Sequence, residues 1–273
     1  MNHHDTKTTT GLVVHTWSAA DPRAVVLLQH GYTEYAERYV SDYNQLIPRL
    51  NERGYHVVAM DMEGHGRSPG TRGVVNVKKA VTGHLEVREK VASYELPIFL
   101  FGHSLGGLVT AGSVTAMSSH IHGVILTGPA LPNPPVGLLR SAVNMVATLI
   151  PDVSVPLPRA SMEGLSRIPQ VREKVLADSR IPKRNIPFIL AATALETAQD
   201  VKLGTMGWTV PTMIMHGTAD TWTDPQGSHR LIEAVQSRDK TLRLFDDGRH
   251  ELLNDLDQDI VLEEILDWLD RHV

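Results

Sequence analysis

The sequence predicts an α/β fold in which a mostly parallel central sheet is flanked by helices, with a helical cap inserted late in the chain. Short apolar runs alternate with longer segments of helical period, and several of these runs are apolar throughout, as strands covered on both faces are. The alternation stops after about residue 130 and resumes near residue 208. We therefore expect core segments at 1–130 and 208–273, with a cap at 131–207 between them.

The predicted strands share a short length, β-branched or long aliphatic side chains, and Gly, Pro or polar residues at their ends. They are 12–17, 24–30, 56–61, 98–102, 123–128, 212–217 and 242–246. Because helical segments separate most of them, the sheet is expected to be mostly parallel.

The core helices are predicted from apolar residues at helical spacing. They are 40–52, 76–94, 105–118, 226–237 and 259–271. In the last of these, Ile260, Ile265, Trp268 and Leu269 are expected on one apolar stripe. Asp224 precedes Pro225, which is typical of an N-cap followed by proline at the first helical position.

The segment 131–207 is rich in proline, opens with "LPNPPVG" and contains no convincing strand. Its first predicted helix, 137–150, is apolar on most sides, and Leu139, Val143 and Val146 lie on one stripe. This helix could pack against the core, line a site for an apolar substrate or touch a membrane, and these roles are compatible. We expect these three side chains to line the substrate site.

Composition excludes several classes of function. A chain of 273 residues with 42% hydrophobic content can bury a large core, whereas a net charge of −5, a pI near 6.3 and the lack of a long Lys/Arg run argue against nucleic acid as a partner. The absence of cysteine excludes disulfides, thiol nucleophiles and thiolate metal sites. No stretch has the character of a signal peptide or a membrane span. We expect a soluble, cytoplasmic protein, with the cap as the part that could contact a membrane or lipid surface; the sequence does not indicate its oligomeric state.

The stretch "PIFLFGHSLGGLVTAG" places a serine between glycines where a predicted strand gives way to a predicted helix. On such a sharp turn Gly102 and Gly106 lack the Cβ atoms that would collide, which leaves Ser104 raised at the end of the strand. The turn also places the backbone N–H of Leu105 at the start of the helix, where it can stabilise an oxyanion. Ser104 is therefore the candidate nucleophile.

A serine nucleophile on this turn requires an acid and then a histidine later in the chain. Asp220 follows the predicted strand 212–217, and His250 follows the last predicted strand. Asp224 is the alternative acid, but its place before Pro225 suits an N-cap better. We expect Ser104, Asp220 and His250 to meet at the carboxyl edge of the sheet.

Other histidines near this edge are interpreted as hydrogen-bonded structural residues, namely His30, His65, His103 and His216. His3 and His4 do not form a ligand set with each other, and no HExxH motif is present. We therefore expect no metal and no cofactor.

Six motifs extend over nearly the whole chain: "HGYTEYAERY" (30–39), "DMEGHGRSPGTRG" (61–73), "GHSLGG" (102–107), "LTGPAL" (126–131), "HGTADTWTDPQGS" (216–228) and "GRHELLND" (248–255). With them the chain resembles the α/β-hydrolases, and among these the monoacylglycerol lipases and lysophospholipase-like serine hydrolases, actinobacterial ones in particular. The resemblance implies an α/β-hydrolase fold, the triad inferred above and a serine esterase that acts on a small lipid ester.

The resemblance also implies roles that the pattern alone does not give. The backbone N–H of Tyr32 would be the second oxyanion donor, and Glu34 and Arg38 would lie beside a glycerol-like head of the substrate; the alternative is that these two form a surface ion pair. The sequence departs from many relatives at Tyr35, where they have histidine, and at Trp222, where an aliphatic residue is common.

These roles describe an acyl-enzyme mechanism. Ser104 attacks an ester carbonyl, His250 takes its proton and Asp220 stays ionised, after which water hydrolyses the acyl-enzyme. Monoacylglycerol is the expected substrate. A lysophospholipase, a thioesterase, another carboxylesterase and an aminopeptidase are the alternative enzymes, and a ligand-binding protein that lacks catalysis is the alternative from another class.

Overall fold

The sheet of the computed structural model, which describes residues 2–133, 138–156, 158 and 160–273, confirms the predicted α/β class. Its eight strands are β1 (Asn2–Lys7), β2 (Val13–Ser18), β3 (Ala24–Gln29), β4 (Tyr55–Met60), β5 (Ile98–His103), β6 (Gly123–Thr127), β7 (Thr212–Gly217) and β8 (Lys240–Phe245). Their order is β1-β2-β4-β3-β5-β6-β7-β8. Strands β3 to β8 are mutually parallel, whereas β2 runs antiparallel to both β1 and β4.

The helices are α1 (Arg38–Ser41), α2 (Leu46–Glu52), α3 (Val77–Ala92), α4 (Leu105–Ala116), α5 (Leu138–Leu149), α6 (Pro169–Ala177), α7 (Phe188–Gly204), α8 (Pro225–Ala234) and α9 (Gln258–His272). The described residues also form four short 3₁₀ turns: η1 (Tyr43–Gln45), η2 (Met162–Gly164), η3 (Thr205–Gly207) and η4 (Leu252–Asn254).

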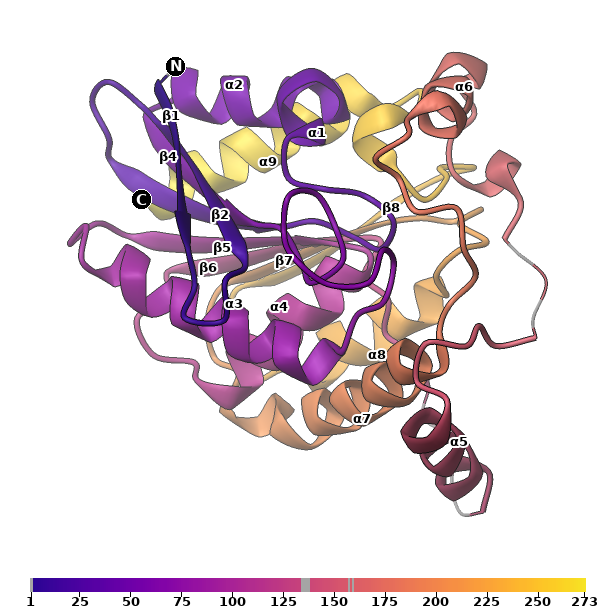
Figure 1. Cartoon of the computed structure of the whole chain (residues 1–273). Coiled ribbons are helices and arrows are strands. Elements are labelled where there is room, and N and C mark those ends of the chain that lie inside the picture. The colour runs from indigo at the N-terminus through magenta and orange to yellow at the C-terminus, as the bar shows by residue number, and fades with distance from the viewer. Residues whose placement is uncertain (1, 134–137, 157, 159) are drawn as a thin grey trace.

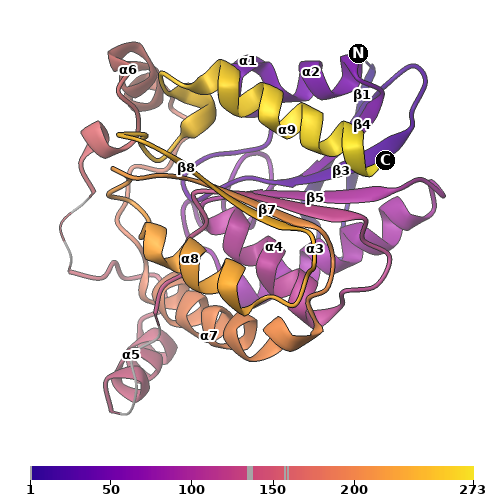
Figure 2. The ribbon, with the colours of Figure 1, turned by 180° about the vertical axis from the view of Figure 1, so that it is seen from behind.

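Helices cover both faces of the sheet. Figures 1 and 2 show α1, α2 and α9 on one face and α3, α4, α7 and α8 on the other. Strand β3 serves both layers, because Val25 and Leu27 pack into one core while Val26 and Leu28 pack into the other. This double burial explains why the parallel strands are apolar along their whole length.

Strand β1 is the one strand that the sequence analysis did not predict. Its six residues, "NHHDTK", are all exposed and pair only with β2 at the edge of the sheet. An exposed edge strand has no buried face, so it lacks the apolar alternation by which strands are recognised in a sequence.

The predicted helix 40–52 is wrong as a single element. The chain breaks into α1, η1 and α2 because Tyr43, Asn44 and Gln45 have positive φ values of 52°, 50° and 54°. Here the backbone N–H of Tyr43 donates to Oδ1 of Asn254 (2.6 Å) and the Tyr43 side chain is buried. This contact with a distant part of the chain overrides the local helical pattern.

The apolar stripe predicted for the last helix is correct at Ile265, Trp268 and Leu269, which are buried, but not at Ile260, which is exposed. The buried side of α9 begins instead at Val261 and Leu262. Since one residue turns a helix by about 100°, a shift of one position moves the side chain out of the core.

Within 131–207 the described residues form helices and one isolated β-bridge, between Ser154 and Pro187. Helices α5 and α6 lie at the end of the molecule away from both chain termini (Figure 1). Helix α7, by contrast, packs with α3 and α4 in the layer that covers the sheet. None of the helices in the described part of the chain is long and apolar enough to cross a membrane.

Candidate active site

Ser104 occupies the turn between β5 and α4 in a backbone conformation that is rare for a residue with a side chain, with φ 55° and ψ −121°. The neighbouring glycine is needed because a Cβ atom at Gly106 would lie 2.1 Å from the carbonyl oxygen of Gln29. This close approach packs the start of α4 against the end of β3. The turn thus has the strained geometry that raises a nucleophile above the sheet.

The three predicted triad residues meet at this turn. His250 Nε2 lies 2.8 Å from Ser104 Oγ, and His250 Nδ1 lies 2.8 Å from Asp220 Oδ2. They follow β5, β7 and β8, whose parallel carboxyl ends reach the same edge of the sheet. His250 and Asp220 are buried, while Ser104 is partly exposed.

Asp220 is held by several donors. Its Oδ1 accepts hydrogen bonds from the backbone N–H groups of Trp222 (2.7 Å) and Thr223 (3.0 Å), while its Oδ2 contacts His216 Nε2 at 3.1 Å and the Thr223 hydroxyl at 2.6 Å. Burial alone raises the pKa of Asp220, but the adjacent His250 and these hydrogen bonds hold that pKa well below its usual range. The carboxylate is therefore ionised at neutral pH.

Burial also affects the pKa of His250, but it does not determine the direction of the net shift. It lowers the pKa of His250, whereas the charge of Asp220 and the hydrogen bond to it raise that pKa more strongly, so the net change is upward. An imidazole with a raised pKa that contacts a serine hydroxyl is suited to accept the hydroxyl proton.

Asp224, the alternative acid, lies elsewhere. Its side chain accepts a hydrogen bond from the backbone N–H of Gln226 (2.9 Å) and caps α8, with Pro225 at the first helical position. The predicted N-cap is confirmed.

The four histidines interpreted as structural are all buried and hydrogen-bonded. His30 bonds Gly31, His65 bonds Thr33, His103 bonds Thr127 and His216 bonds both Ser228 and Asp220. Burial lowers the pKa of His65 and of His103 to about 3. Both are therefore neutral, and His250 is the imidazole that contacts Ser104.

The two predicted oxyanion donors, Leu105 and Tyr32, belong to segments that approach Ser104 closely. Leu105 is the first residue of α4, where backbone N–H groups lack an acceptor within the helix. Tyr32 lies in the loop after β3, and this loop packs so closely that a Cβ atom on Gly31 would lie 2.9 Å from the Ser104 Cβ. The Tyr32 hydroxyl donates to the Gly73 carbonyl oxygen (2.9 Å), which ties the large side chain to the neighbouring loop.

Glu34 and Arg38, implied by the resemblance as neighbours of the substrate head, are only 3% and 4% exposed. Glu34 Oε1 accepts hydrogen bonds from the Gly31 N–H and from the Tyr39 hydroxyl (3.1 Å), and Arg38 Nη1 lies 3.4 Å from Glu34 Oε2. Their ion pair is therefore buried rather than on the surface. These contacts hold the loop that carries Tyr32.

A residue that the sequence analysis did not single out, Glu251, completes this buried network. The Tyr43 hydroxyl lies 2.6 Å from Glu34 Oε2 and 2.8 Å from Glu251 Oε1, and Arg38 Nη1 lies 3.3 Å from the same Glu251 oxygen. Burial is the main cause of a raised pKa at Glu34. At Glu251 burial also acts upward, but Arg38, His103 and the hydrogen bonds of Asn254 and Tyr43 together lower the pKa. The pKa values of the two buried carboxyl groups are thus displaced in opposite directions, and Glu251 adjoins His250 in the chain.

Segment 131–207 is bonded directly to the loop that carries His250. The backbone N–H groups of His250 and Glu251 donate to the carbonyl oxygens of Gly164 (3.0 Å) and Leu165 (2.9 Å). The indole of Trp222 stacks against the His250 ring with centroids 5.5 Å apart and donates to the Ser161 carbonyl oxygen (2.9 Å). Trp222, a position at which the sequence departs from many relatives, thus covers one face of the His250 ring.

Tyr35, the other position where the sequence departs from many relatives, also contacts segment 131–207. It is buried, its hydroxyl donates to Asp178 Oδ2 (2.6 Å), and the Arg180 guanidinium lies 4.0 Å above its ring centroid. Asp178 caps the carboxyl end of α6, so Tyr35 links the loop after β3 to this helix.

Of the predicted apolar lining, Val146 is half-buried on α5, whereas the side chains of Leu139 and Val143 fall outside the described residues. The same helix exposes Met145 (62%) and Leu149 (73%), and Ile150 and Val153 beyond it are exposed too. Four exposed apolar side chains therefore lie on α5 and in the four residues that follow it.

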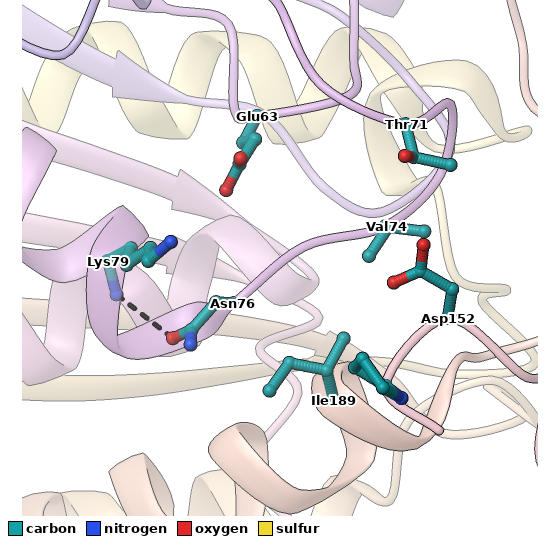
Figure 3. A pocket seen from close by; sticks show the side chains of 8 residues that line it. Glu63, Thr71, Val74, Asn76, Lys79, Asp152 and Ile189 are labelled. Atoms are coloured by element: carbon teal, nitrogen blue, oxygen red, sulfur yellow. Dashed lines mark hydrogen bonds between the residues drawn. The ribbon is translucent and has the colours of Figure 1, made fainter. Parts of the chain in front are cut away.

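A separate pocket of about 280 Å³ lies between the loop that leads into α3 and residues of segment 131–207 (Figure 3). It is lined by Glu63, Thr71, Val74, Asn76, Lys79, Pro151, Asp152 and Ile189. The lining is largely polar and contains neither Ser104 nor Asp220 nor His250, so this pocket is distinct from the candidate active site.

The chain is similar to known proteins along most of its length. The family model described as serine aminopeptidase S33 matches residues 20–257. The chain is 28% identical to the monoacylglycerol lipase of Mycolicibacterium smegmatis, over 96% of this chain and 94% of that protein, and 28% identical to the monoglyceride lipase of Rattus norvegicus, over 92% and 84%. The crystal structure of Paleococcus ferrophilus monoacylglycerol lipase superposes with a TM-score of 0.85 at 29% identity, covering 96% of this chain and 99% of that one.

Proposed function

This chain belongs to the serine aminopeptidase S33 family, within the α/β-hydrolase fold, and from that premise we propose that it hydrolyses monoacylglycerol to glycerol and a fatty acid. It is a serine ester hydrolase. The observation that carries the substrate proposal is the unbroken contact from Ser104 through His250 to Asp220 in a chain similar along nearly its whole length to monoacylglycerol lipases.

In the proposed reaction Ser104 Oγ attacks the ester carbonyl carbon while His250 Nε2 takes the hydroxyl proton. The N–H groups of Leu105 and Tyr32 stabilise the oxyanion. The intermediate collapses, His250 passes the proton to the departing glycerol oxygen, and an acyl-enzyme remains. Water then attacks the acyl carbon with His250 again as base, and the fatty acid leaves as Ser104 recovers its proton.

The buried position of Glu34 and Arg38 supports a positioning role for both. Glu34 holds the Gly31 N–H, and Gly31 precedes the proposed donor Tyr32. Because Arg38 also contacts Glu251, the same cluster steadies the histidine loop. We assign these residues to the placement of the oxyanion donors and of His250 rather than to contact with glycerol.

We propose that 131–207 forms the cap over this site and that α5 contributes to the acyl-chain lining through Leu139, Val143 and Val146. Burial of each CH₂ is worth about 0.8 kcal/mol, so kcat/KM is expected to rise by up to about fourfold per CH₂ until the lining is filled. The exposed side chains Met145 and Leu149 would then contact the lipid surface that presents the substrate.

The test compares mono-, di- and triacylglycerols of one medium chain length in the same detergent, together with a lysophospholipid, an acyl-CoA and an amino-acid p-nitroanilide. Monoacylglycerol is expected to have the highest kcat/KM. Ser104→Ala should fold normally and lose at least about 10³-fold in rate on every ester. Faster hydrolysis of triacylglycerol would overturn the monoester proposal, while the fastest rate on the lysophospholipid, acyl-CoA or anilide would assign the same triad to that substrate.

A further inference from the structure

Three side chains with metal-binding atoms meet at the edge of the sheet, outside the active site. His3 and Asp5 are two residues apart on β1, so they lie on the same face of the strand. The register pairs Asp5 with His15 and His3 with Trp17 on β2, which brings His15 to that face too. The sequence analysis considered His3 with His4, whose side chain points to the other face and lines a pocket with Thr6.

The three candidate ligand atoms form a small triangle. Asp5 Oδ1 lies 3.1 Å from His3 Nε2 and 3.0 Å from His15 Nδ1, and the two nitrogens are 3.3 Å apart. Around a tetrahedral Zn²⁺ with bonds of about 2.0–2.1 Å, neighbouring ligand atoms are separated by about 3.3 Å. One ion can therefore reach all three atoms with little movement of the side chains.

The buried carboxylate of Asp61 orients the His15 ring. His15 Nε2 lies 3.0 Å from Asp61 Oδ2, and both side chains are buried. Both ring nitrogens of His15 face a carboxylate, and in the tautomer that donates its Nε2 hydrogen to Asp61 the Nδ1 lone pair points toward His3 and Asp5. A histidine that donates one N–H to a carboxylate and offers the other nitrogen is the usual arrangement at metal sites.

The ring of His3 is also held in place. It stacks on Trp17 with centroids 4.8 Å apart and planes inclined by 12°. His3 and Asp5 keep side chains that are each 32% exposed, which leaves a route from solvent to the site.

One cation already contacts the cluster. Arg67 Nη2 lies 2.5 Å from Asp5 Oδ2 and 3.0 Å from His15 Nδ1. Its side chain is 46% exposed, so the guanidinium can turn into solvent while its backbone N–H remains on Asp61 Oδ2 (2.8 Å). Arg67 is therefore expected to compete with a bound ion.

We propose that His3, Asp5 and His15 bind one divalent transition-metal ion, with Zn²⁺ the best match to two imidazole nitrogens and one carboxylate oxygen. Water fills the fourth position. The ion pins the edge strand β1 to β2, and the Asp61 carboxylate links it to the loop after β3, because Asp61 Oδ1 accepts a hydrogen bond from the Ala36 N–H (2.9 Å).

The test measures binding of Zn²⁺ by calorimetry, and of Co²⁺ by its visible absorption, to the whole chain prepared without a histidine tag. Wild type should bind one ion. His3→Ala and Asp5→Ala, both changes at exposed positions, should each weaken binding at least about 10-fold. His4→Ala is the matched control and should bind as wild type does, whereas Arg67→Met should bind more tightly.

Hydrogen exchange provides a second measurement. Zn²⁺ should slow exchange of the β1 amides in wild type and in His4→Ala, but not in His3→Ala. The proposal would be overturned if wild type, His3→Ala and Asp5→Ala bound Zn²⁺ with equal affinity. It would also be overturned if His3→Ala and His4→Ala lost affinity for Zn²⁺ to the same extent.

Discussion

Asp220 and Asp224 are four residues apart but have different partners. Asp220 receives the hydrogen bonds of His250, Trp222 and Thr223, whereas Asp224 caps α8. Asp220→Asn should lower kcat by several orders of magnitude, because an amide favours the wrong imidazole tautomer. Asp224→Asn should retain nearly full activity, since asparagine also caps helices. Steady-state kinetics on p-nitrophenyl butyrate measures both variants, and the reverse ranking would transfer the role of acid to Asp224.

The pKa of His250 predicts the acid side of the pH profile. The base works only when neutral, so kcat/KM should fall as pH decreases through this pKa. Because Asp220 raises the pKa of His250, the midpoint should lie above the ordinary histidine value of about 6.5. In Asp220→Asn the remaining activity should fall only at lower pH. A midpoint in wild type below that of Asp220→Asn would contradict the assignment, provided that circular dichroism shows both proteins folded.

At the level of elements, the turn between β5 and α4 can be tested through its glycine. Gly106→Ala should unfold the protein or shift the turn and abolish activity, because the new Cβ would lie 2.1 Å and 2.4 Å from two backbone oxygens that cannot move away. Gly207→Ala is the matched control, since a Cβ there meets nothing within 4 Å. Thermal unfolding and esterase activity measure both changes. A fully active Gly106→Ala would contradict the close packing of α4 on β3.

The elements that could be predicted from the sequence are those whose own residues show a recognisable pattern. The parallel strands bury both faces and read as apolar runs, and the serine turn needs glycines that are visible in the chain. The break at Tyr43 could not be predicted, because it depends on Asn254, more than two hundred residues later. Strand β1 was not predicted, because its residues are polar and exposed and it forms a strand only by pairing with β2.

In the candidate site, too, residues with a local sequence pattern could be predicted, whereas residues defined by distant contacts could not. The sequence predicted that three side chains lie close together, because each follows a strand in a recognisable order: Ser104, Asp220 and His250. Glu251 was not singled out, because its significance comes from Tyr43 and Arg38, which approach it from the other end of the chain. Contacts that join distant segments carry no local pattern.

At the scale of the whole molecule, the apolar surface of α5 predicts how the protein meets its substrate. Met145→Glu combined with Leu149→Glu should reduce sedimentation with phosphatidylcholine vesicles and raise KM for monoacylglycerol in vesicles, while kinetics on dissolved p-nitrophenyl butyrate stay near wild type. Leu256→Glu with Ile260→Glu is the control, because both residues are exposed near α9 in the opposite helical layer. Equal losses for the two pairs would exclude a specific role for α5.

The carbonyl groups of Gly164 and Leu165 hold the N–H groups of His250 and Glu251. For protein engineering this divides segment 131–207 into two kinds of sequence. The piece around α5 can be exchanged for the matching piece of a relative, whereas 161–168 is bonded to the His250 loop and must stay with it. We expect a chimera whose junctions lie before residue 160 to keep the contact of His250 with Ser104, and a chimera with a junction inside 161–168 to lose the hydrogen bonds that hold the His250 loop.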